Sequence, residues 1–310
     1  MTPRILITGA AGYLGHQLGN RLATDLHVVG TDIRARDDLD FPVHQLDIRD
    51  PALAELLQEQ QITHVVHLAS VLQASADRHR DFDIDVNGTR NVLECCLRAG
   101  VRHLTVTSSG AAYGYHADNP EWIDEQDPLR GNPEFAYSDH KRQIEEMLAS
   151  YRQGHPQLQQ LIFRPGTILG ADTRNQITEL FMAPRLLALR GSDSPFVFIW
   201  DQDVIAAMEM GLRQSRTGIY NMAGDGALSM REIATRLNKP VRTLPVWLVR
   251  LGLQLAQWRG RPTSPAQVRF LQYRPVLSNR RLKEEFGFVP SKTSAETLDY
   301  FAQCSGARRP

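Results

Sequence analysis

Short apolar runs alternate along the chain with longer segments whose apolar residues recur every three or four positions. The short runs are apolar at consecutive positions, which is typical of strands buried on both faces of a parallel sheet. We expect strands at residues 4–8, 27–31, 64–68, 103–107, 161–165 and 218–222, and helices near residues 13–24, 51–60, 84–99, 133–152 and 201–214. This alternation predicts right-handed βαβ units and an α/β fold with a doubly wound parallel sheet.

Two later stretches break the alternation. Residues 166–200 predict loops and one helix, and beyond residue 226 the chain becomes mostly helical and richer in Arg, Pro and aromatic residues. Ligands bind at the carboxyl edge of such sheets, so we expect these parts to form a substrate lobe there. The predicted domains are a dinucleotide-binding domain at 1–168, with 191–225 returning to the sheet, and a smaller, mostly helical lobe made of 169–190 and 226–310.

Composition narrows the class of protein. The 310 residues include 35 Lys and Arg and 35 Asp and Glu, so no bulk charge attracts nucleic acid or an acidic membrane. The three cysteines show neither metal nor disulfide spacing, which fits a reducing compartment, and the ten histidines form no ligand-spaced cluster for a metal. No signal-peptide pattern precedes the strand-like RILIT, and no apolar run reaches the ~18 residues of a membrane span. We therefore expect a soluble, cytoplasmic protein.

The run closest to a membrane span is LPVWLVRLGLQLAQW at residues 244–258, which contains Arg250 and two Gln. We interpret it as an amphipathic helix packed on the protein, with membrane contact as the alternative. Its apolar stripe consists of Trp247, Leu248, Leu251, Leu253, Leu255 and Trp258. Such a stripe usually belongs to the core, although it could line a pocket for a lipid or steroid-like alcohol.

The segment ILITGAAGYLGHQL at residues 5–18 places three glycines between a predicted strand and a predicted helix. Gly9 suits the tight turn, Gly12 allows the backbone to approach a bound group, and Gly15 lets the helix pack against the strand. The helix N-terminus offers free N–H groups and a positive dipole end to a pyrophosphate. This segment therefore predicts dinucleotide binding.

The second predicted strand, residues 27–31, leads directly into Asp32, 17 residues after Gly15. A carboxylate at this place can accept hydrogen bonds from the adenosine ribose hydroxyls. It would also repel a 2′-phosphate, so NAD is favoured over NADP. Arg34 and Arg36 lie close enough in sequence to keep this preference moderate.

A second group of residues suggests acid–base chemistry. Thr107, Ser108 and Ser109 follow the strand-like HLTVT, at the same sheet edge as the glycines. In NPEFAYSDHKRQIEEML (132–148) we expect Asn132 to cap a helix that begins at Pro133. Tyr137 and Lys141 then share one face of this helix.

This spacing has a chemical use. A phenol is a poor base at neutral pH, but an ammonium one turn away favours the phenolate. Tyr137 could then exchange the proton of a secondary alcohol while the cofactor takes the hydride, and Ser109 could hydrogen-bond the same oxygen. The predicted catalytic residues are Ser109, Tyr137 and Lys141.

With these motifs in this order, the sequence resembles the extended branch of the short-chain dehydrogenase/reductase superfamily, and within it the NAD-dependent, UDP-galactose 4-epimerase-like epimerase/dehydratase group. The resemblance spans residues 4 to about 300 and includes TGAAGYLG, HLAS, DVNGT, SSGAAYG and FRPGTILG. It implies a Rossmann sheet, NAD as cofactor, and a homodimer that pairs helices 84–99 and 133–152. The cofactor-binding residues expected from motifs and resemblance together are Gly9, Gly12, Tyr13, Leu14, Gly15, Asp32, Asp47, Ile48, Leu68, Ala69, Ser70, Asn87, Thr107, Tyr137, Lys141 and Pro165.

The sequence departs from the family pattern in three places. The 4,6-dehydratases carry an Asp-Glu pair where this chain has Gly110 and Ala111, which argues against dehydratase activity. UDP-galactose 4-epimerases usually place an Asn where this chain has Thr167. The segment before FIWDQD also lacks the Arg that often binds a substrate diphosphate. Candidate replacements are Arg185, Arg190, Arg274 and Arg280.

The leading hypothesis is an NAD-dependent oxidoreductase or epimerase that transfers hydride at a secondary alcohol, with a nucleotide sugar as the first substrate class. The alternative enzyme is a one-way NAD(P)-dependent reductase or dehydrogenase of a lipid, steroid-like or other small carbonyl compound. An alternative from another class is a non-catalytic dinucleotide-sensing protein. Such proteins typically lack the Tyr/Lys pair that this chain carries.

Overall fold

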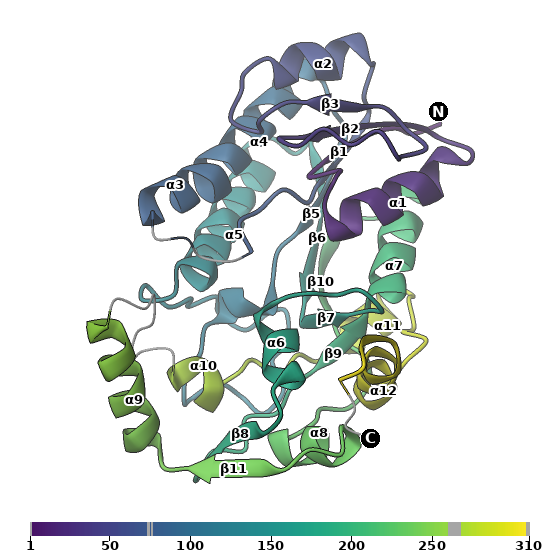
Figure 1. The fold of residues 1–310 in the computed structure, drawn as a ribbon. Helices are drawn as coiled ribbons and strands as arrows, with labels where there is room; N and C mark the ends of the chain where they lie inside the picture. The colour runs from purple at the N-terminus through teal and green to yellow at the C-terminus, as the bar shows by residue number, and fades with distance from the viewer. Residues whose placement is uncertain (1, 73–74, 76, 260–267, 308–310) are drawn as a thin grey trace. The chain divides into compact units, whose positions relative to one another are not determined.

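The computed structural model of the chain describes residues 2–72, 75, 77–259 and 268–307. Its main feature is a seven-stranded sheet in the order β10-β6-β5-β4-β1-β2-β3 (Figure 1). The strands are β1 (Arg4–Thr8), β2 (His27–Asp32), β3 (Val43–Gln45), β4 (His64–His67), β5 (His103–Thr107), β6 (Gln159–Pro165) and β10 (Gly218–Met222). The order turns at β1, from which later strands are added on both sides, so the predicted doubly wound sheet is confirmed.

The register of the parallel strands brings their carboxyl ends together at one edge of the sheet. Thr8 at the end of β1 pairs with Thr31 of β2 and with His67 of β4. His67 in turn pairs with Val106 of β5, one residue before Thr107. The last residues of these strands therefore lie along one sheet edge, where ligands bind in such folds.

Helices cover both faces of the sheet. The flanking helices are α1 (Tyr13–Ala23), α2 (Leu53–Glu59), α4 (Gly88–Ala99), α5 (Ala136–Gly154) and α7 (Asp201–Arg213), with α3 (Arg78–Phe82) and one π-helical turn, η1 (Asp83–Asn87), before α4. Residues of α2, α4 and α5 share one apolar core with the strands, and α1 and α7 lie on the other side (Figure 1). Cys95 and Cys96 of α4 are buried in this core, whereas Cys304 is exposed. The pairing of two copies through α4 and α5 stays a prediction.

The contacts within the chain divide it into two compact units. The first unit comprises residues 1–109, 140–164 and 204–220, and the second comprises residues 110–139, 165–203 and 221–310. The predicted domain boundaries differ from this division and stay a prediction about folding units. Helix α5 begins in the second unit and continues into the first.

The second unit contains short strands and mostly short helices around an aromatic core. Its elements are η2 (Gly110–Tyr113), β7 (Thr167–Leu169), α6 (Gln176–Met182), β8 (Leu186–Leu189), β9 (Phe198–Trp200), α8 (Met230–Arg236), β11 (Val241–Leu244), α9 (Val246–Trp258), α10 (Val268–Gln272), α11 (Arg280–Glu284) and α12 (Ser294–Ser305). Strand β7 pairs with β9, and β8 pairs with β11. Phe181, Phe196 and Phe198 form its aromatic centre.

Three expectations about this part of the chain were wrong. Residues 166–200 contain three short strands besides the predicted helix, because strands of three or four residues show too little periodicity to be recognised. Helix α5 begins at Ala136, since the Asn132 side chain accepts a hydrogen bond from the Tyr115 N–H at 2.6 Å and so does not cap the helix. The stripe on α9 is not core, because no residue of α9 is buried within the described structure.

No helix in the described part of the chain is both long enough and apolar enough to cross a membrane.

Candidate functional site

The glycine turn after β1 is closely packed. Gly9 has a φ of +70°, a conformation that residues with a Cβ rarely adopt. A Cβ at Gly9 would lie 2.8 Å from the Ala69 nitrogen, and a Cβ at Gly15 would overlap the carbonyl oxygen of Gly9. Glycine is therefore required at positions 9 and 15 to let the turn approach β4 and to let α1 start directly above the turn.

The N-terminus of α1 fits a pyrophosphate. Gly12 is the N-cap residue of this helix, and within the described structure no side chain caps it and no acidic residue stands in the first turn. Tyr13 and Leu14 begin the helix and are half-buried. A helix start without a capping side chain leaves backbone N–H groups and the positive dipole end available to an anion.

Asp32 lies at the end of β2 beside the glycine turn. Its carboxylate accepts hydrogen bonds from the backbone N–H groups of Ala11 at 3.1 Å and Arg34 at 3.0 Å. Arg36 reaches the same turn, where its guanidinium donates to the Ala11 carbonyl at 3.3 Å and pairs with Asp38. A carboxylate fixed in this way can accept ribose hydroxyls, as NAD binding requires.

Two of the predicted cofactor-binding residues, Asp47 and Ile48, differ in their surroundings. Asp47 pairs with Arg49 at 2.6 Å, and this hydrogen bond holds the pKa of Asp47 below its usual value despite partial burial. Arg49 also bridges to Asp83 at 2.7 Å. Ile48 is buried against Gly88, where a Cβ would lie 2.6 Å from the Ile48 side chain. Ile48 therefore belongs to the core, and Arg49 neutralises the charge of Asp47.

Residues 68–70, directly after β4, lie beside the end of β1. The Leu68 N–H donates to the Thr8 carbonyl at 3.2 Å, and the Ala69 N–H donates to the Thr8 hydroxyl at 3.4 Å. The Ser70 hydroxyl donates to Asp85 at 3.0 Å. These bonds place residues 68–70 beside β1, as expected for the lining of a cofactor pocket.

The structure does not place the Asn87 side chain with the other predicted cofactor-binding residues. Asn87 is exposed and its side-chain amide donates to Asp83 at 2.9 Å, one turn earlier. Asp85, two residues before it, is the acidic residue of this segment that faces inward.

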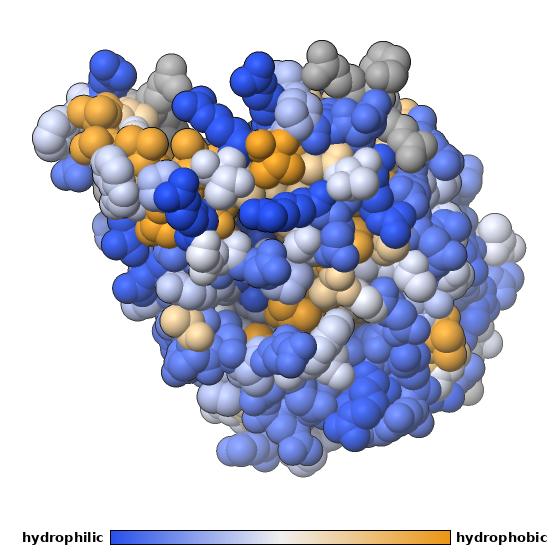
Figure 2. Space-filling view, turned by 90° about the horizontal axis from the view of Figure 1, so that it is seen from below, coloured by the Kyte–Doolittle hydropathy of each residue, from blue (hydrophilic) through white to orange (hydrophobic). Residues whose placement is uncertain are grey.

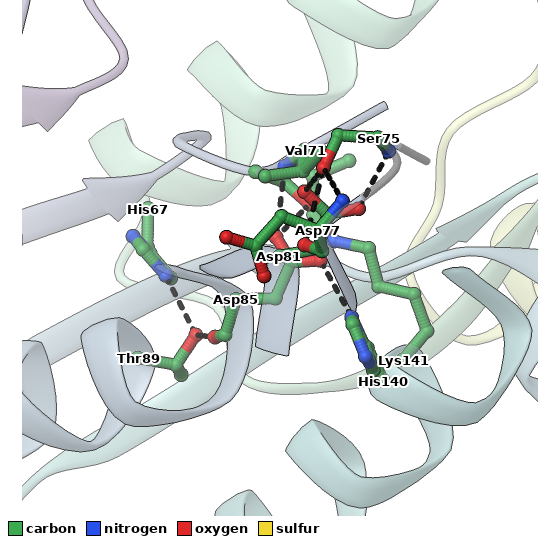
Figure 3. A network of polar contacts seen from close by, with 11 residues as sticks. His67, Val71, Ser75, Asp77, Asp81, Asp85, Thr89, His140 and Lys141 are labelled. Atoms are coloured by element: carbon green, nitrogen blue, oxygen red, sulfur yellow. Dashed lines mark hydrogen bonds and ion pairs between the residues drawn. The ribbon is translucent and has the colours of Figure 1, made fainter. Parts of the chain in front are cut away.

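Asp85 is the centre of a buried polar network that the sequence analysis missed (Figure 3). Its carboxylate contacts the His140 ring at 2.9 Å and accepts hydrogen bonds from Ser70 and from the Val71 N–H at 2.8 Å. Burial raises the pKa of Asp85, but the His140 contact, the charge of Lys141 and the other donors together lower it below its usual 3.8. Asp85 is therefore a buried carboxylate kept ionised by its neighbours.

Lys141 follows His140 on α5 and is buried. Its Nζ lies 3.2 Å from the carbonyl oxygen of Thr107, at the end of β5. The Thr107 hydroxyl is buried and has no hydrogen-bond partner among the described residues. Such an unsatisfied hydroxyl at the ligand-binding edge is consistent with a group that binds there. Ser109, two residues further, is half-buried.

Ser108 differs in its contacts from Thr107 and Ser109 on either side of it. It donates to Glu145 at 2.6 Å, and Glu145 forms a fully buried ion pair with Arg164. Ser108 therefore belongs to the interior of the first unit and not to the ligand edge. Pro165 ends β6 directly after Arg164.

Tyr137 has its own surroundings in the second unit. Burial raises the pKa of Tyr115 above its usual 10; Tyr137 acts in the same direction and the positive charge of Arg274 opposes it. Because electrostatic effects weaken with distance, Tyr137, Tyr115 and Arg274 must lie in one neighbourhood. The ring of Tyr115 packs edge-on against Phe135 and Phe270, at centroid distances of 5.2 and 5.3 Å.

Arg274 is the most unusual cation of the second unit. Its Nε is buried without a hydrogen-bond partner among the described residues, and no carboxylate there pairs with it. The guanidinium stacks 3.5 Å from the centre of the Phe196 ring and donates to the Ser194 carbonyl at 2.7 Å. Burial lowers the pKa of Arg274 to about 9, with Tyr115 opposing this effect.

A cavity of about 320 Å³ lies beside Arg274. Its polar lining consists of His116, Asn119, Ser194 and Gln272, with the exposed carboxylates of Glu121 and Asp193. The other three candidate arginines do not share this environment. Arg185 and Arg190 are exposed, and Arg280 is exposed and pairs with Asp124 at 3.1 Å. Of the four arginines considered from the sequence, only Arg274 is placed to bind an anion inside a cavity.

Position 110 has no room for a larger side chain, and position 111 is buried beside it. Both residues are buried in η2, and a Cβ at Gly110 would lie 2.9 Å from the Leu277 side chain. The Ala111 carbonyl accepts the Ser138 hydroxyl at 2.7 Å. The segment after Ser109 is thus packed without acidic groups.

Comparison with known proteins shows the family. A model of the NAD dependent epimerase/dehydratase family matches residues 5–223. The chain therefore belongs to the NAD dependent epimerase/dehydratase family, and the predictions of this family and of NAD as its cofactor are confirmed.

Individual relatives are distant. The chain is 25% identical over 325 residues to N-acetyl-alpha-D-glucosaminyl-diphospho-ditrans,octacis-undecaprenol 4-epimerase of Escherichia coli O157:H7, covering 96% of this chain and 94% of that protein. Among solved structures it is similar to the UDP-glucose 4-epimerase of Thermus thermophilus in complex with NAD, with a TM-score of 0.74, 25% identity, and coverage of 97% and 98%. WbmG of Bordetella bronchiseptica, in complex with NAD and UDP, shares the fold with a TM-score of 0.77, 21% identity, and coverage of 99% and 94%.

Proposed function

We propose that this protein is an epimerase that acts on a secondary alcohol of a nucleotide sugar. The observation that carries the proposal is Arg274, a cation without a carboxylate partner in the described structure that lines a cavity in the neighbourhood of Tyr137. A buried, unneutralised guanidinium is costly unless an anion completes the site. A diphosphate is the part of a nucleotide sugar that would supply this anion, and a UDP-glucose 4-epimerase is among the similar proteins.

Each of the chain's own residues has a separate role in this reaction. NAD, when bound, accepts a hydride and returns it. Tyr137 exchanges the proton of the substrate hydroxyl, and Ser109 hydrogen-bonds the same oxygen. Lys141, held against the Thr107 carbonyl, supplies the positive charge that favours the phenolate. Asp32 favours NAD over NADP because its fixed carboxylate would repel a 2′-phosphate.

The proposal excludes sugar 4,6-dehydration. That reaction needs an acid and a base placed beside the sugar to remove water. At positions 110 and 111 the chain offers Gly and Ala, packed against Leu277 and Ser138. Epimerisation needs neither carboxyl group.

Two variants separate substrate binding from chemistry. Arg274→Gln should weaken UDP binding, measured by calorimetry, by about 10- to 100-fold, because a charge-assisted phosphate contact is worth about 1.5–3 kcal/mol. Tyr137→Phe should bind UDP and NAD normally and lose about 10²- to 10⁴-fold in turnover of UDP-glucose. The matched control Arg280→Gln removes an exposed arginine of the same unit and should leave both properties unchanged.

Mass spectrometry of the ligand released from the purified protein identifies the retained dinucleotide and any trapped substrate. Retained NAD with no net cofactor turnover supports epimerisation. UDP binding that is equal in Arg274→Gln and the parent protein would contradict the diphosphate site. Steady NADH production with a sugar-free alcohol would support a one-way dehydrogenase instead.

A further inference from the structure

Helix α9 exposes a large apolar stripe. The exposed residues are Trp247, Leu248, Leu251, Leu255 and Trp258, and the two tryptophans are 66% and 75% exposed. Figure 2 shows apolar side chains gathered over this helix, at the upper left of the view, with hydrophilic ones between them. Within the described structure no residue of α9 is buried, so the stripe contributes nothing to the core.

The stripe and the side that faces the protein are distinct. Val246, Val249, Leu253 and Ala256 recur at helical spacing and are half-buried. The exposed residues from Leu248 to Trp258 also recur every three or four positions, on another side of the helix. Helix α9 is therefore apolar on two sides, only one of which is partly covered in the described structure.

The sequence segment that contains α9 is rich in basic residues, five of which pair with carboxylates outside the segment. Residues 233–283 contain eleven Lys and Arg and no Asp or Glu, whereas the rest of the chain contains 24 basic and 35 acidic residues. Arg250 lies within α9 and Arg259 follows its last residue; both are exposed, and neither pairs with a carboxylate in the described structure. The apolar stripe is thus set in a basic, acid-free segment of an otherwise acidic chain.

These features favour one occupant. A helix with Trp and Leu on one side and Arg beside them is typical of helices that lie in a bilayer interface, and anionic headgroups attract such basic segments. A second copy of α9 would bring the same arginines together, because it carries no acidic residue to pair with them. Charge complementarity therefore points to a lipid surface and away from self-association.

We propose that α9 docks this protein on an anionic membrane surface, with the Trp247–Trp258 stripe in the interface and Arg250 and Arg259 on the headgroups. The docking needs no membrane span. It is independent of the proposed reaction, since α9 holds none of the residues assigned to catalysis or diphosphate binding.

Co-sedimentation of the full chain with lipid vesicles tests this proposal. We expect binding to vesicles of equal phosphatidylcholine and phosphatidylglycerol that is at least about tenfold tighter than to pure phosphatidylcholine, and weaker in 0.5 M salt. Brominated lipid should quench the tryptophan fluorescence of the bound protein. The triple variant Trp247→Ser, Leu251→Ser, Trp258→Ser should lose binding, and Arg250→Gln with Arg259→Gln should weaken it by about fivefold for each arginine.

The matched control is Val289→Ser, which removes an apolar side chain that is 68% exposed outside α9 and should leave binding unchanged. Thermal unfolding checks that every variant is folded, because substitutions at exposed positions should leave stability unchanged. Protein that stays in the supernatant with both vesicle types, or that binds both equally, overturns the proposal. A concentration-dependent dimer that the triple variant abolishes, without vesicle binding, overturns it in favour of a copy-to-copy interface.

Discussion

Asp85 carries a full negative charge where water has little access. The residues around it compensate for the free energy lost when the carboxylate is removed from water. Its partners come from three places in the sequence: Ser70 and Val71 after β4, and His140 on α5. Because its carboxylate also interacts electrostatically with Lys141, it links the lining of the cofactor pocket to the helix of the proposed catalytic lysine. We expect Asp85 to position these elements without touching the substrate.

Asp85→Asn should lower the free energy of unfolding by about 2–4 kcal/mol, because removing one partner of a buried charged pair leaves the other uncompensated. Urea unfolding at pH 7 measures this loss. The pKa of Asp85 is lowered in the folded state, so the carboxylate stabilises the fold above its usual 3.8, and this contribution disappears as the pH falls below that value. The difference between variant and parent should therefore shrink toward pH 3.

Asp118→Asn provides the matched control, since Asp118 is largely exposed and pairs with Arg130 at the surface. It should change stability by less than about 1 kcal/mol. A double-mutant cycle with His140→Gln isolates the contact between Asp85 and His140. An additive cycle would show that the two residues are not coupled.

Some residues of the candidate site could be predicted from the sequence alone, and others could not. Gly15 and Asp32 could be predicted from spacing because their contacts, with Gly9 and with Ala11, lie within one βαβ unit. Asp85 could not, since its partner His140 lies 55 residues away and either residue alone suggests a surface position. Arg274 was one candidate among four until the structure showed which arginine lines a cavity and pairs with no carboxylate among the described residues.

The βα turn between β1 and α1 depends on contacts that only glycine permits. Gly15→Ala should lower the free energy of unfolding by about 1–3 kcal/mol and weaken NAD binding, because the new methyl group overlaps the Gly9 carbonyl and lies 2.9 Å from the Ala10 Cα. Urea unfolding and NAD titration check both effects.

Gly252→Ala is a control within another helix, because a Cβ at Gly252 meets no atom of the described residues within 4 Å. Alanine there should stabilise the protein by about 0.5–1 kcal/mol. If both substitutions had the same effect, the packing explanation for Gly15 would be wrong.

Element boundaries were harder to predict than the elements of the main sheet. Strands β5 and β10 begin and end where the apolar pattern placed them, because a buried parallel strand has a clear apolar signature. The start of α5 was wrong by three residues, since Asn132 bonds to a distant backbone N–H. The apolar pattern of α9 predicted a helix correctly, but a pattern alone does not tell whether an apolar side faces a core or the surface.

At the scale of the whole molecule, buried histidines make stability depend on pH. Burial lowers the pKa of His64 to about 4 and that of His67 to about 3, and it also lowers that of His103. In the unfolded chain these groups titrate near 6.5. Between these values the unfolded state binds more protons, so acid favours unfolding.

The free energy of unfolding should fall from pH 7 to pH 5, with His67 alone contributing about 2 kcal/mol. Urea unfolding at the two pH values measures the loss. His67→Gln should reduce it by about that amount, whereas His44→Gln, at an exposed position of β3, should not change it. An unchanged loss in the His67 variant would show that other groups cause the pH dependence.

The distribution of cysteines gives the molecule one usable chemical handle. Burial raises the pKa of both Cys95 and Cys96, so neither forms the thiolate that electrophiles attack. Cys304, near the end of α12, is the exposed member of the three. A maleimide dye should therefore attach at a single position of the natural sequence, which would allow fluorescence tracking without first removing native thiols.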